Sequence, residues 1–317
     1  MDPNARVFVA GHRGLVGSAL VRRLGSERFS DVVTRTRQEL DLTRQADVER
    51  FFETTRPRYV FVAAAKVGGI VANDTLRADF IRENLLIQTN VIDAAYRSGV
   101  EKLLFLGSSC IYPRLAPQPI QEDALLSGPL EPTNDAYAVA KIAGIKMIEA
   151  YRRQYGFRGI CVQSTSLYGP GDSFDPAHSH VIPAMIRKFH EAKLTGATTV
   201  TIWGTGTPRR EFMHVDDLAD ACVHLMRTYD DAKLVNVGCG EDIAIAELAH
   251  LVQKTVGFGG DIAFDTTKPD GTPRKLLDVS RLATLGWKRE RISLEEGIRG
   301  AYAWFLENVS NPRALEA

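Results

Sequence analysis

Short apolar runs recur along the first half of the chain, at Val7–Ala10, Tyr59–Val62, Leu103–Leu106 and Ile160–Val162. Runs of this length without polar interruption are typical of strands buried on both faces of a parallel sheet. Longer stretches between them repeat apolar residues with the period of a helix. The pattern predicts an α/β fold, with a doubly wound parallel sheet covered by helices on both faces.

Two of these helices are predicted at residues 79–98 and 137–155. Beyond Gly171 the strict alternation ends, because stretches rich in glycine and proline interrupt shorter elements. We therefore expect residues 1–170 to form a first lobe, and residues 171–317 to form mainly a smaller α/β lobe, with some later segments returning to the first. Helices are expected in the second half at Asp217–Arg227 with Asp216 as its cap, Ala246–Val256 and Leu294–Asn308.

Composition narrows the class of protein. The 317 residues are 44% hydrophobic, and 39 basic residues balance 39 acidic ones, so no overall field attracts nucleic acid or an anionic membrane. No secretion signal and no apolar stretch long enough to span a membrane is evident. The four cysteines are far apart without metal-type spacing, which favours reduced thiols, a cytoplasmic location and no metal site. His214-Val215-Asp216-Asp217 is interpreted as a helix entry.

A glycine-rich segment follows the first strand and reads Gly11-His12-Arg13-Gly14-Leu15-Val16-Gly17. Glycines let the backbone turn tightly and approach a pyrophosphate, whose charge is stabilised at a helix N-terminus. The spacing is G-x-x-G-x-x-G, and an ordinary strand-to-helix turn is the alternative interpretation. Its place in the first strand-helix unit favours a Rossmann-type dinucleotide site.

Basic residues stand where an NAD enzyme carries a carboxylate for the ribose, since the chain has Thr34-Arg35-Thr36-Arg37 there. A guanidinium at Arg37, with Arg13 in the glycine segment, suits the 2′-phosphate of NADP(H). The alternative is that these are solvated loop charges. Asp41-Leu42 is expected beside the adenine, and small residues at Ala63-Ala64-Ala65 leave room for the cofactor.

Tyr137 and Lys141 are four residues apart, hence on one face of the helix predicted there. A nearby ammonium would lower the pKa of the phenol and let it exchange a proton with a carbonyl or alcohol oxygen. Ser108 follows a strand at the ligand-binding edge of the sheet and can polarise the same oxygen. The Y-x-x-x-K spacing alone also occurs by chance in many helices.

The glycine triplet, Ser108 and the Tyr137/Lys141 pair, in this order, resemble the extended short-chain dehydrogenases. Longer segments resemble the GDP-L-fucose synthases over nearly the whole chain. That family epimerises GDP-4-dehydro-6-deoxy-D-mannose at C3 and C5 and then reduces C4 with NADPH. The segments are Gly11–Gly14, Ala64–Ile70, Gly107–Pro113, Ser179–Pro183 and Lys268–Lys275.

The resemblance implies roles for individual residues. Cys110 would be the base and His180 the acid of epimerisation, although a buried core thiol and a capping or surface histidine are the alternatives. Tyr137 would protonate the C4 oxygen, with Ser108 sharing the hydrogen bond and Lys141 keeping Tyr137 poised. Further cofactor contacts are implied at Leu106, Gly107, Ser164, Thr165, Ser166, Leu167 and His180, and substrate contacts at Ser108, Ser109, Cys110, Tyr137, His180, Lys188, Trp203, Arg210 and Asp270.

The sequence also permits other interpretations of single residues and of the function. Arg209-Arg210 could be a solvated loop pair, and Trp203 could belong to the core. Ser166 stands where the family pattern leads us to expect asparagine, so a contact from that side chain is in doubt. Rival functions are a sugar-nucleotide 4-epimerase, a 4,6-dehydratase and a non-catalytic NADP-binding scaffold. The resemblance also implies a homodimer formed through the helices around 79–98 and 137–155.

Overall fold

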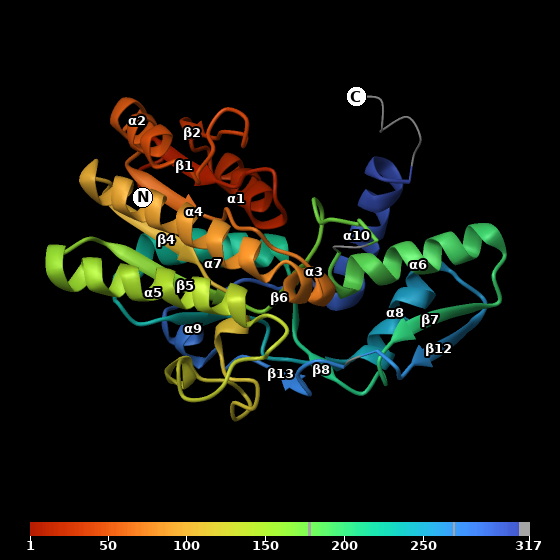
Figure 1. Cartoon of the computed structure of the whole chain (residues 1–317). Coiled ribbons are helices and arrows are strands. Elements are labelled where there is room, and N and C mark those ends of the chain that lie inside the picture. The colour runs from red at the N-terminus through yellow and green to blue at the C-terminus, as the bar shows by residue number, and fades with distance from the viewer. Residues whose placement is uncertain (177–178, 269, 311–317) are drawn as a thin grey trace.

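The computed structural model describes residues 1–176, 179–268 and 270–310. The chain forms two parts, a larger one built on the N-terminal half and a smaller one that contains most of the C-terminal half (Figure 1). Within the described residues, no helix is long and apolar enough to cross a membrane.

A six-stranded sheet forms the centre of the larger part. Its strands lie in the order β10-β5-β4-β3-β1-β2, and every neighbouring pair is parallel. The four predicted strands are confirmed, because each coincides with or lies within an observed one. The strands are β1 (Val7–Ala10), β2 (Val32–Val33), β3 (Tyr59–Val62), β4 (Lys102–Leu106), β5 (Gly159–Ser164) and β10 (Val235–Val237).

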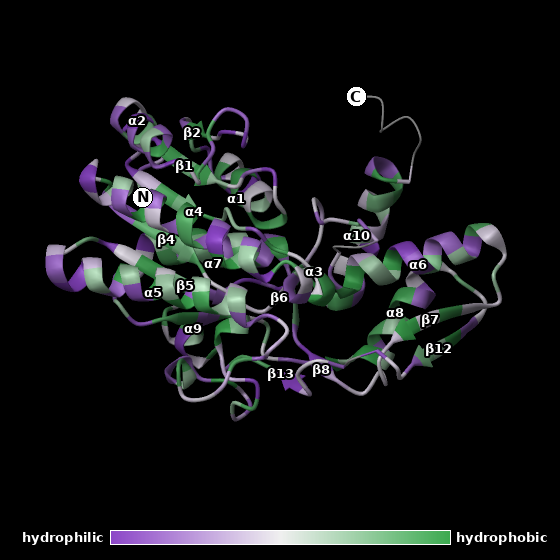
Figure 2. Ribbon diagram, viewed as in Figure 1, coloured by the Kyte–Doolittle hydropathy of each residue, from purple (hydrophilic) through white to green (hydrophobic). Residues whose placement is uncertain are grey.

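Helices cover both faces of this sheet, so the predicted doubly wound α/β architecture is confirmed. One hydrophobic core joins α1 (Leu15–Ser26) and α7 (Val215–Thr228) to one face, and a second joins α2 (Gln45–Thr55), α4 (Arg77–Arg97) and α5 (Asp135–Tyr155) to the other. The strands are coloured predominantly hydrophobic in Figure 2, whereas the helices carry both colours. Both α7 and β10 come from beyond residue 171, and α9 (Ser280–Thr284) packs beside β10.

The smaller part has a hydrophobic core of its own. Helices α6 (Val181–Thr195), α8 (Ile245–Val256) and α10 (Leu294–Asn308) pack with the parallel pair β7 (Thr199–Trp203) and β12 (Asp261–Asp265). The C-terminal helix begins as predicted, with a capping box between Ser293 and Glu296.

Short elements connect the two parts. Three two-residue strands form a small sheet in the order β11-β8-β13, and β6 pairs in parallel with β9. The small three-stranded sheet consists of β8 (Arg209–Arg210), β11 (Ile243–Ala244) and β13 (Arg274–Lys275). The remaining elements are β6 (Ser166–Tyr168), β9 (Phe212–His214), α3 (Ile70–Thr75), and the 3-10 turns η1 (Ser109–Ile111) and η2 (Glu122–Ala124).

One local expectation and one alternative were wrong. Helix α7 is capped by His214, not by Asp216, because the imidazole Nδ1 accepts the backbone N–H of Asp216 at 3.2 Å. Asp216 lies inside the first turn, where its carboxylate is favoured by the helix dipole and pairs with Arg22 at 2.6 Å. Arg209 and Arg210 do not lie in a loop, because they form β8.

Candidate active site

One cavity of about 1130 Å³ lies at the carboxyl ends of the central strands and is lined by residues of both parts. Open α/β sheets bind their ligands at this edge. Every site residue predicted from the sequence lines the cavity except His12. The side chain of His12 is partly buried instead, and its Nδ1 has no hydrogen-bond partner among the described residues.

The glycine segment forms a tight turn between β1 and α1. Gly11 has a φ of +86°, and a Cβ there would lie 2.7 Å from the backbone of Ala64. A Cβ on Gly17 would lie 2.0 Å from the carbonyl oxygen of Gly11. Gly14 is the N-cap of α1 and provides no capping side chain. The first residues of the helix line the cavity, so their N–H groups are available to a ligand there. The backbone therefore forms a cradle that fits a pyrophosphate.

Arginines line the adjoining end of the cavity. Arg13, Arg35 and Arg37 all belong to its wall. The Arg37 side chain is 72% exposed, and its guanidinium lies 3.5 Å from the carboxylate of Glu83. Hydrogen bonds from Thr43 to Asp41 lower the pKa of this carboxyl. Three guanidinium groups in one wall of the cavity fit the phosphate-bearing ribose of NADP better than a bare diol.

Ser108, Tyr137 and Lys141 meet beyond the end of β4. Ser108 caps η1 by accepting the N–H of Cys110 at 3.3 Å. The Lys141 ammonium is buried, donates to the carbonyl of Leu106 at 2.8 Å, and lies 5.9 Å from the centre of the Tyr137 ring. Desolvation lowers the pKa of Lys141 to about 8.

The expected lowering of the Tyr137 pKa was wrong. Burial of the phenol raises its pKa, the charge of Cys110 adds to the rise, and the Ser108 hydroxyl opposes it. Desolvation prevails because it penalises the phenolate more than the distant ammonium favours it. Tyr137 is therefore a protonated phenol at neutral pH, which is the form that can give a proton to a ketone oxygen.

Cys110 and His180 lie in the wall of the same cavity. The Cys110 sulfur is half-buried and receives the Asn134 amide at 3.4 Å and the Lys275 ammonium at 3.7 Å. His180 stands at the N-cap position of α6 without making a side-chain cap, and its ring is exposed towards the cavity. Surrounding protein desolvates the imidazole and lowers its pKa.

The smaller part supplies aromatic and charged groups at the other end. Trp203 is 53% exposed, so the alternative that it belongs to the core is wrong. The ammonium groups of Lys188 and Lys268 lie 5.3 and 5.6 Å from the centre of its rings. Arg210 donates to the carbonyl of Asp270 at 3.3 Å, and the Asp270 carboxylate accepts the N–H of Thr205 at 2.7 Å. Segment 268–275 of the family resemblance includes residue 269, which lies outside the described residues.

Sequence reasoning missed several residues of the wall. Asn134 and Lys275 touch Cys110, yet neither has a spacing that marks it, and β13 is too short to show a pattern. Asp172 is buried, and desolvation raises its pKa to about 7. Its place in a Gly-Pro-Gly-Asp turn was the available signal. Ser166, the departure from the family pattern, lines the cavity from β6.

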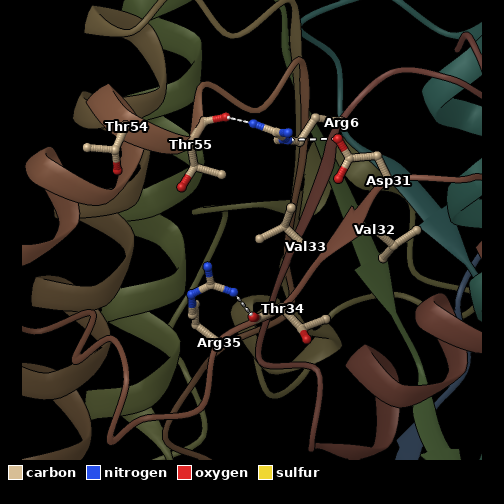
Figure 3. Close-up of a pocket in the computed structure, with 8 residues that line it drawn as sticks. All are labelled: Arg6, Asp31, Val32, Val33, Thr34, Arg35, Thr54 and Thr55. Carbon is tan, nitrogen blue, oxygen red and sulfur yellow. Dashed lines mark hydrogen bonds and ion pairs between the residues drawn. The ribbon is translucent and has the colours of Figure 1, made fainter.

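Other parts of the molecule hold less chemistry. No group of three or more histidine, cysteine or acidic residues able to hold a metal occurs in the described ranges. A second hollow lies along β2, where Arg6 pairs with Asp31 at 2.8 Å and donates to the carbonyl of Thr55 at 2.7 Å (Figure 3). Arg35 donates to the carbonyl of Thr34 there. These polar groups satisfy one another, so the hollow offers no reactive centre.

Comparisons with known proteins agree with this geometry. Residues 7–238 match the model of the NAD dependent epimerase/dehydratase family. GDP-L-fucose synthase 1 of Arabidopsis thaliana is 60% identical over 310 residues, which cover 98% of this chain and 96% of that protein. The crystal structure of a GDP-6-OMe-4-keto-L-xylo-heptose reductase from C. jejuni superposes with a TM-score of 0.93 at 40% identity, covering 97% of this chain and 99% of the other. A GDP-L-fucose synthetase from Naegleria fowleri bound to NADP gives 0.91 at 27% identity, covering 99% and 97%.

Proposed function

The chain belongs to the NAD dependent epimerase/dehydratase family, and from this premise we propose that it catalyses the GDP-L-fucose synthase reaction. It is an NADP-dependent oxidoreductase with epimerase activity. Its substrate is GDP-4-dehydro-6-deoxy-D-mannose, which is epimerised at C3 and C5 and then reduced at C4. The identity to GDP-L-fucose synthases over nearly the whole chain supports this substrate.

The cofactor is NADP(H), which supplies a hydride when bound. The first lobe, residues 1–170, holds it, and residues 171–317 contribute mainly to the sugar nucleotide site. The first N–H groups of α1 take the pyrophosphate, and Arg13 and Arg37 take the 2′-phosphate. Lys141 fixes the ribose next to the nicotinamide, because its ammonium is already anchored on Leu106 at the end of β4.

Epimerisation uses Cys110 and His180. The protons on C3 and C5 are acidified by the C4 ketone, since loss of either gives an enolate. Cys110 removes the proton as a thiolate, and His180 returns one to the other face of the ring. Desolvation lowers the pKa of His180, so at a given pH a smaller share of it is in the acid form than for a free imidazole.

Reduction uses Tyr137 and Ser108. The protonated phenol of Tyr137 gives its proton to the C4 oxygen as the ketone becomes an alcohol, and the Ser108 hydroxyl donates a second hydrogen bond to the same oxygen. At the far end of the substrate, Lys188 and Arg210 hold the diphosphate, Trp203 offers a flat surface, and Asp270 accepts hydrogen bonds.

The observation that carries the proposal is the presence of Cys110 and His180 in the wall that also contains Ser108, Tyr137 and Lys141. A reductase of C4 alone needs only the last three. This second candidate is favoured by the similarity to the C. jejuni heptose reductase. A 4-epimerase or a scaffold would not consume NADPH.

The test is NADPH oxidation with GDP-4-dehydro-6-deoxy-D-mannose, followed by identification of the product sugar by NMR. We expect GDP-L-fucose from the parent enzyme. Cys110→Ser should lose epimerisation but keep NADPH binding, whereas Cys239→Ser, a half-buried cysteine outside the cavity wall, should behave like the parent. GDP-D-rhamnose from the parent enzyme would show reduction without epimerisation and contradict the proposal.

We further propose that the enzyme is a homodimer built on α4 and α5 and that it works in the cytoplasm. An apolar row along α5, from Val139 to Tyr155, supports the dimer. The four cysteines are free thiols, which suits a reducing compartment. Fractionation of the host cell checks the location.

A further inference from the structure

The small sheet β11-β8-β13 places four basic residues side by side. Arg209 is paired in register with Arg274, and Arg210 with Lys275. Successive residues of a strand point to opposite faces, so the first pair and the second pair face different surroundings. Arg209 and Arg274 both reach the carboxylate of Asp242, with the Arg209 contact at 2.7 Å. Arg210 and Lys275 line the active-site cavity.

Charge compensation differs between the two pairs. The outer pair, Arg209 and Arg274, shares the Asp242 carboxylate, whose side chain is 5% exposed, and Arg209 also lies 3.6 Å from the Glu247 carboxylate. Arg210 is engaged by the carbonyls of Arg209 and Asp270, at 2.9 and 3.3 Å. The ammonium of Lys275 makes one hydrogen bond within the described residues, and its acceptor is the Cys110 sulfur at 3.7 Å. Lys275 is therefore a cation directed at the thiol.

The sulfur is surrounded by donors. The Asn134 amide donates to it at 3.4 Å from the N-cap position of α5, and Lys275 donates from β13. The charged or titratable groups that face it are Tyr137 from α5, Arg210 from β8 and Lys275 from β13. Asp270 and Glu131 act on Arg210 in turn. Asn134 and Lys275 together bring one positive charge to the sulfur, and both donate hydrogen bonds to it. A thiolate accepts such hydrogen bonds better than a thiol does, so this arrangement favours the thiolate.

We propose that Lys275 is a positioning residue whose ammonium holds Cys110 as the thiolate that takes protons from C3 and C5 of the substrate. This inference rests on the proposed function. The thiolate gains the proton, the breaking C–H bond leaves its electron pair in the enolate, and Lys275 keeps its own protons throughout. Lys275 reaches Cys110 from β13, which belongs to the small sheet that joins the two parts. The thiolate form of Cys110 therefore depends on the packing of the two parts against each other.

The experiment measures the reactivity of Cys110 itself. Parent, Lys275→Met, Lys275→Arg and Arg274→Met proteins are treated with iodoacetamide across a pH series, and the Cys110 peptide is quantified by mass spectrometry. We expect Lys275→Met to slow alkylation at neutral pH roughly tenfold and to move the pH profile upwards, because an opposite charge at this distance favours the ionised form. Lys275→Arg should restore most of the rate. Arg274→Met, on the opposite face of the same strand, should match the parent.

Kinetics with the sugar nucleotide separate this role from substrate binding. Lys275→Met should lower kcat and the exchange of the C3 and C5 protons with deuterated solvent, with little change in KM. A raised KM with an unchanged kcat would mean that Lys275 binds the substrate. Alkylation of Cys110 in Lys275→Met at the parent rate over the whole pH series would also overturn the proposal.

Two further measurements separate the role of Lys275 from that of Cys110. If Lys275→Met does not fold, Lys275→Gln takes its place in the alkylation series, and alkylation of Cys110 in that variant at the parent rate overturns the role of Lys275. Cys110→Ser tests the proposed function separately. If that variant still exchanges C3 and C5 protons at the parent rate, Cys110 is not the base, whatever Lys275 does to its reactivity.

Discussion

At the scale of single residues, we expect the choice between NADPH and NADH to depend on Arg37. Its side chain is 72% exposed in the cavity wall, and its guanidinium lies 3.5 Å from the Glu83 carboxylate. A guanidinium placed this way can turn to a 2′-phosphate without breaking a strong pair. We expect Arg37→Ala to weaken NADPH binding by roughly 10- to 100-fold, as for loss of hydrogen bonds to a charged group. NADH lacks that phosphate and should lose little.

Titration of each variant with NADPH and NADH, followed by fluorescence, checks this. Arg44→Ala is the matched control, because Arg44 is also 72% exposed but lies outside the cavity wall. It should bind both cofactors like the parent. Equal losses for NADPH and NADH in Arg37→Ala would sink the assignment to the 2′-phosphate.

The sequence predicted which residues meet in the cavity better than it predicted their protonation. Ser108, Tyr137 and Lys141 were placed correctly in the wall because strand ends and helical spacing are local properties. The direction of the Tyr137 pKa depends on burial by the whole fold, and no spacing records burial. The contact between Lys275 and Cys110 joins residues 165 positions apart, so it was invisible in one sequence.

At the scale of elements, α1 holds two glycines in opposite situations. A Cβ on Gly17 would lie 2.0 Å from the Gly11 carbonyl oxygen, whereas a Cβ on Gly25 meets nothing within 4 Å. Gly17→Ala should therefore push α1 away from the glycine turn, lower the free energy of unfolding by about 1–3 kcal/mol, and weaken NADPH binding. Gly25→Ala makes the same chemical change in the same helix. It should raise the free energy of unfolding by about 0.5–1 kcal/mol, because alanine is the better helix former.

Urea unfolding and NADPH titration of both variants provide the measurement. Opposite signs in stability, with cofactor binding affected only in Gly17→Ala, are expected. Matching stabilities for the two variants would show that α1 does not need the close approach at Gly17.

Long elements were the predictable ones. The helices predicted at 79–98 and 137–155 correspond to α4 and α5. A helical period repeated over many residues is a strong signal even where single residues depart from it. Two-residue strands have no period to detect, so the sequence left a loop open as an alternative where β8 lies. The N-cap of α7 was predicted at Asp216 because aspartate is a common N-cap residue. In the structure the imidazole of His214 accepts the backbone N–H instead.

At the scale of the whole molecule, the cavity with the candidate site is lined by residues of both parts. Lys141 and Cys110 come from the first part, and Lys188, Trp203 and Lys275 come from beyond residue 171. The sequence indicated two lobes through the loss of alternation, but not how they face each other. That arrangement depends on packing between segments distant in the chain, such as the pairing of β6 with β9.

We also expect two chains to assemble through α5. Val139, Ala143, Met147, Tyr151 and Tyr155 follow one another at intervals of four along α5, and none of them is fully buried. Tyr155 stacks on Tyr96 of α4 at 4.6 Å, so the row continues onto the neighbouring helix. An apolar row along two adjacent long helices is the surface expected to pair with its own copy in a helical bundle.

Val139 is 44% exposed in this row, and Leu194, at the end of α6, is 71% exposed far from it. Val139→Arg would place two charges opposite each other across a symmetric interface, because the same patch serves both subunits. We expect light scattering to give the parent and Leu194→Arg twice the 35.0 kDa mass of the chain, and Val139→Arg the mass of one chain. A parent of single-chain mass would rule out the dimer. If Val139→Arg stays dimeric, the interface does not include this part of α5, because a buried pair of like charges would prevent association there.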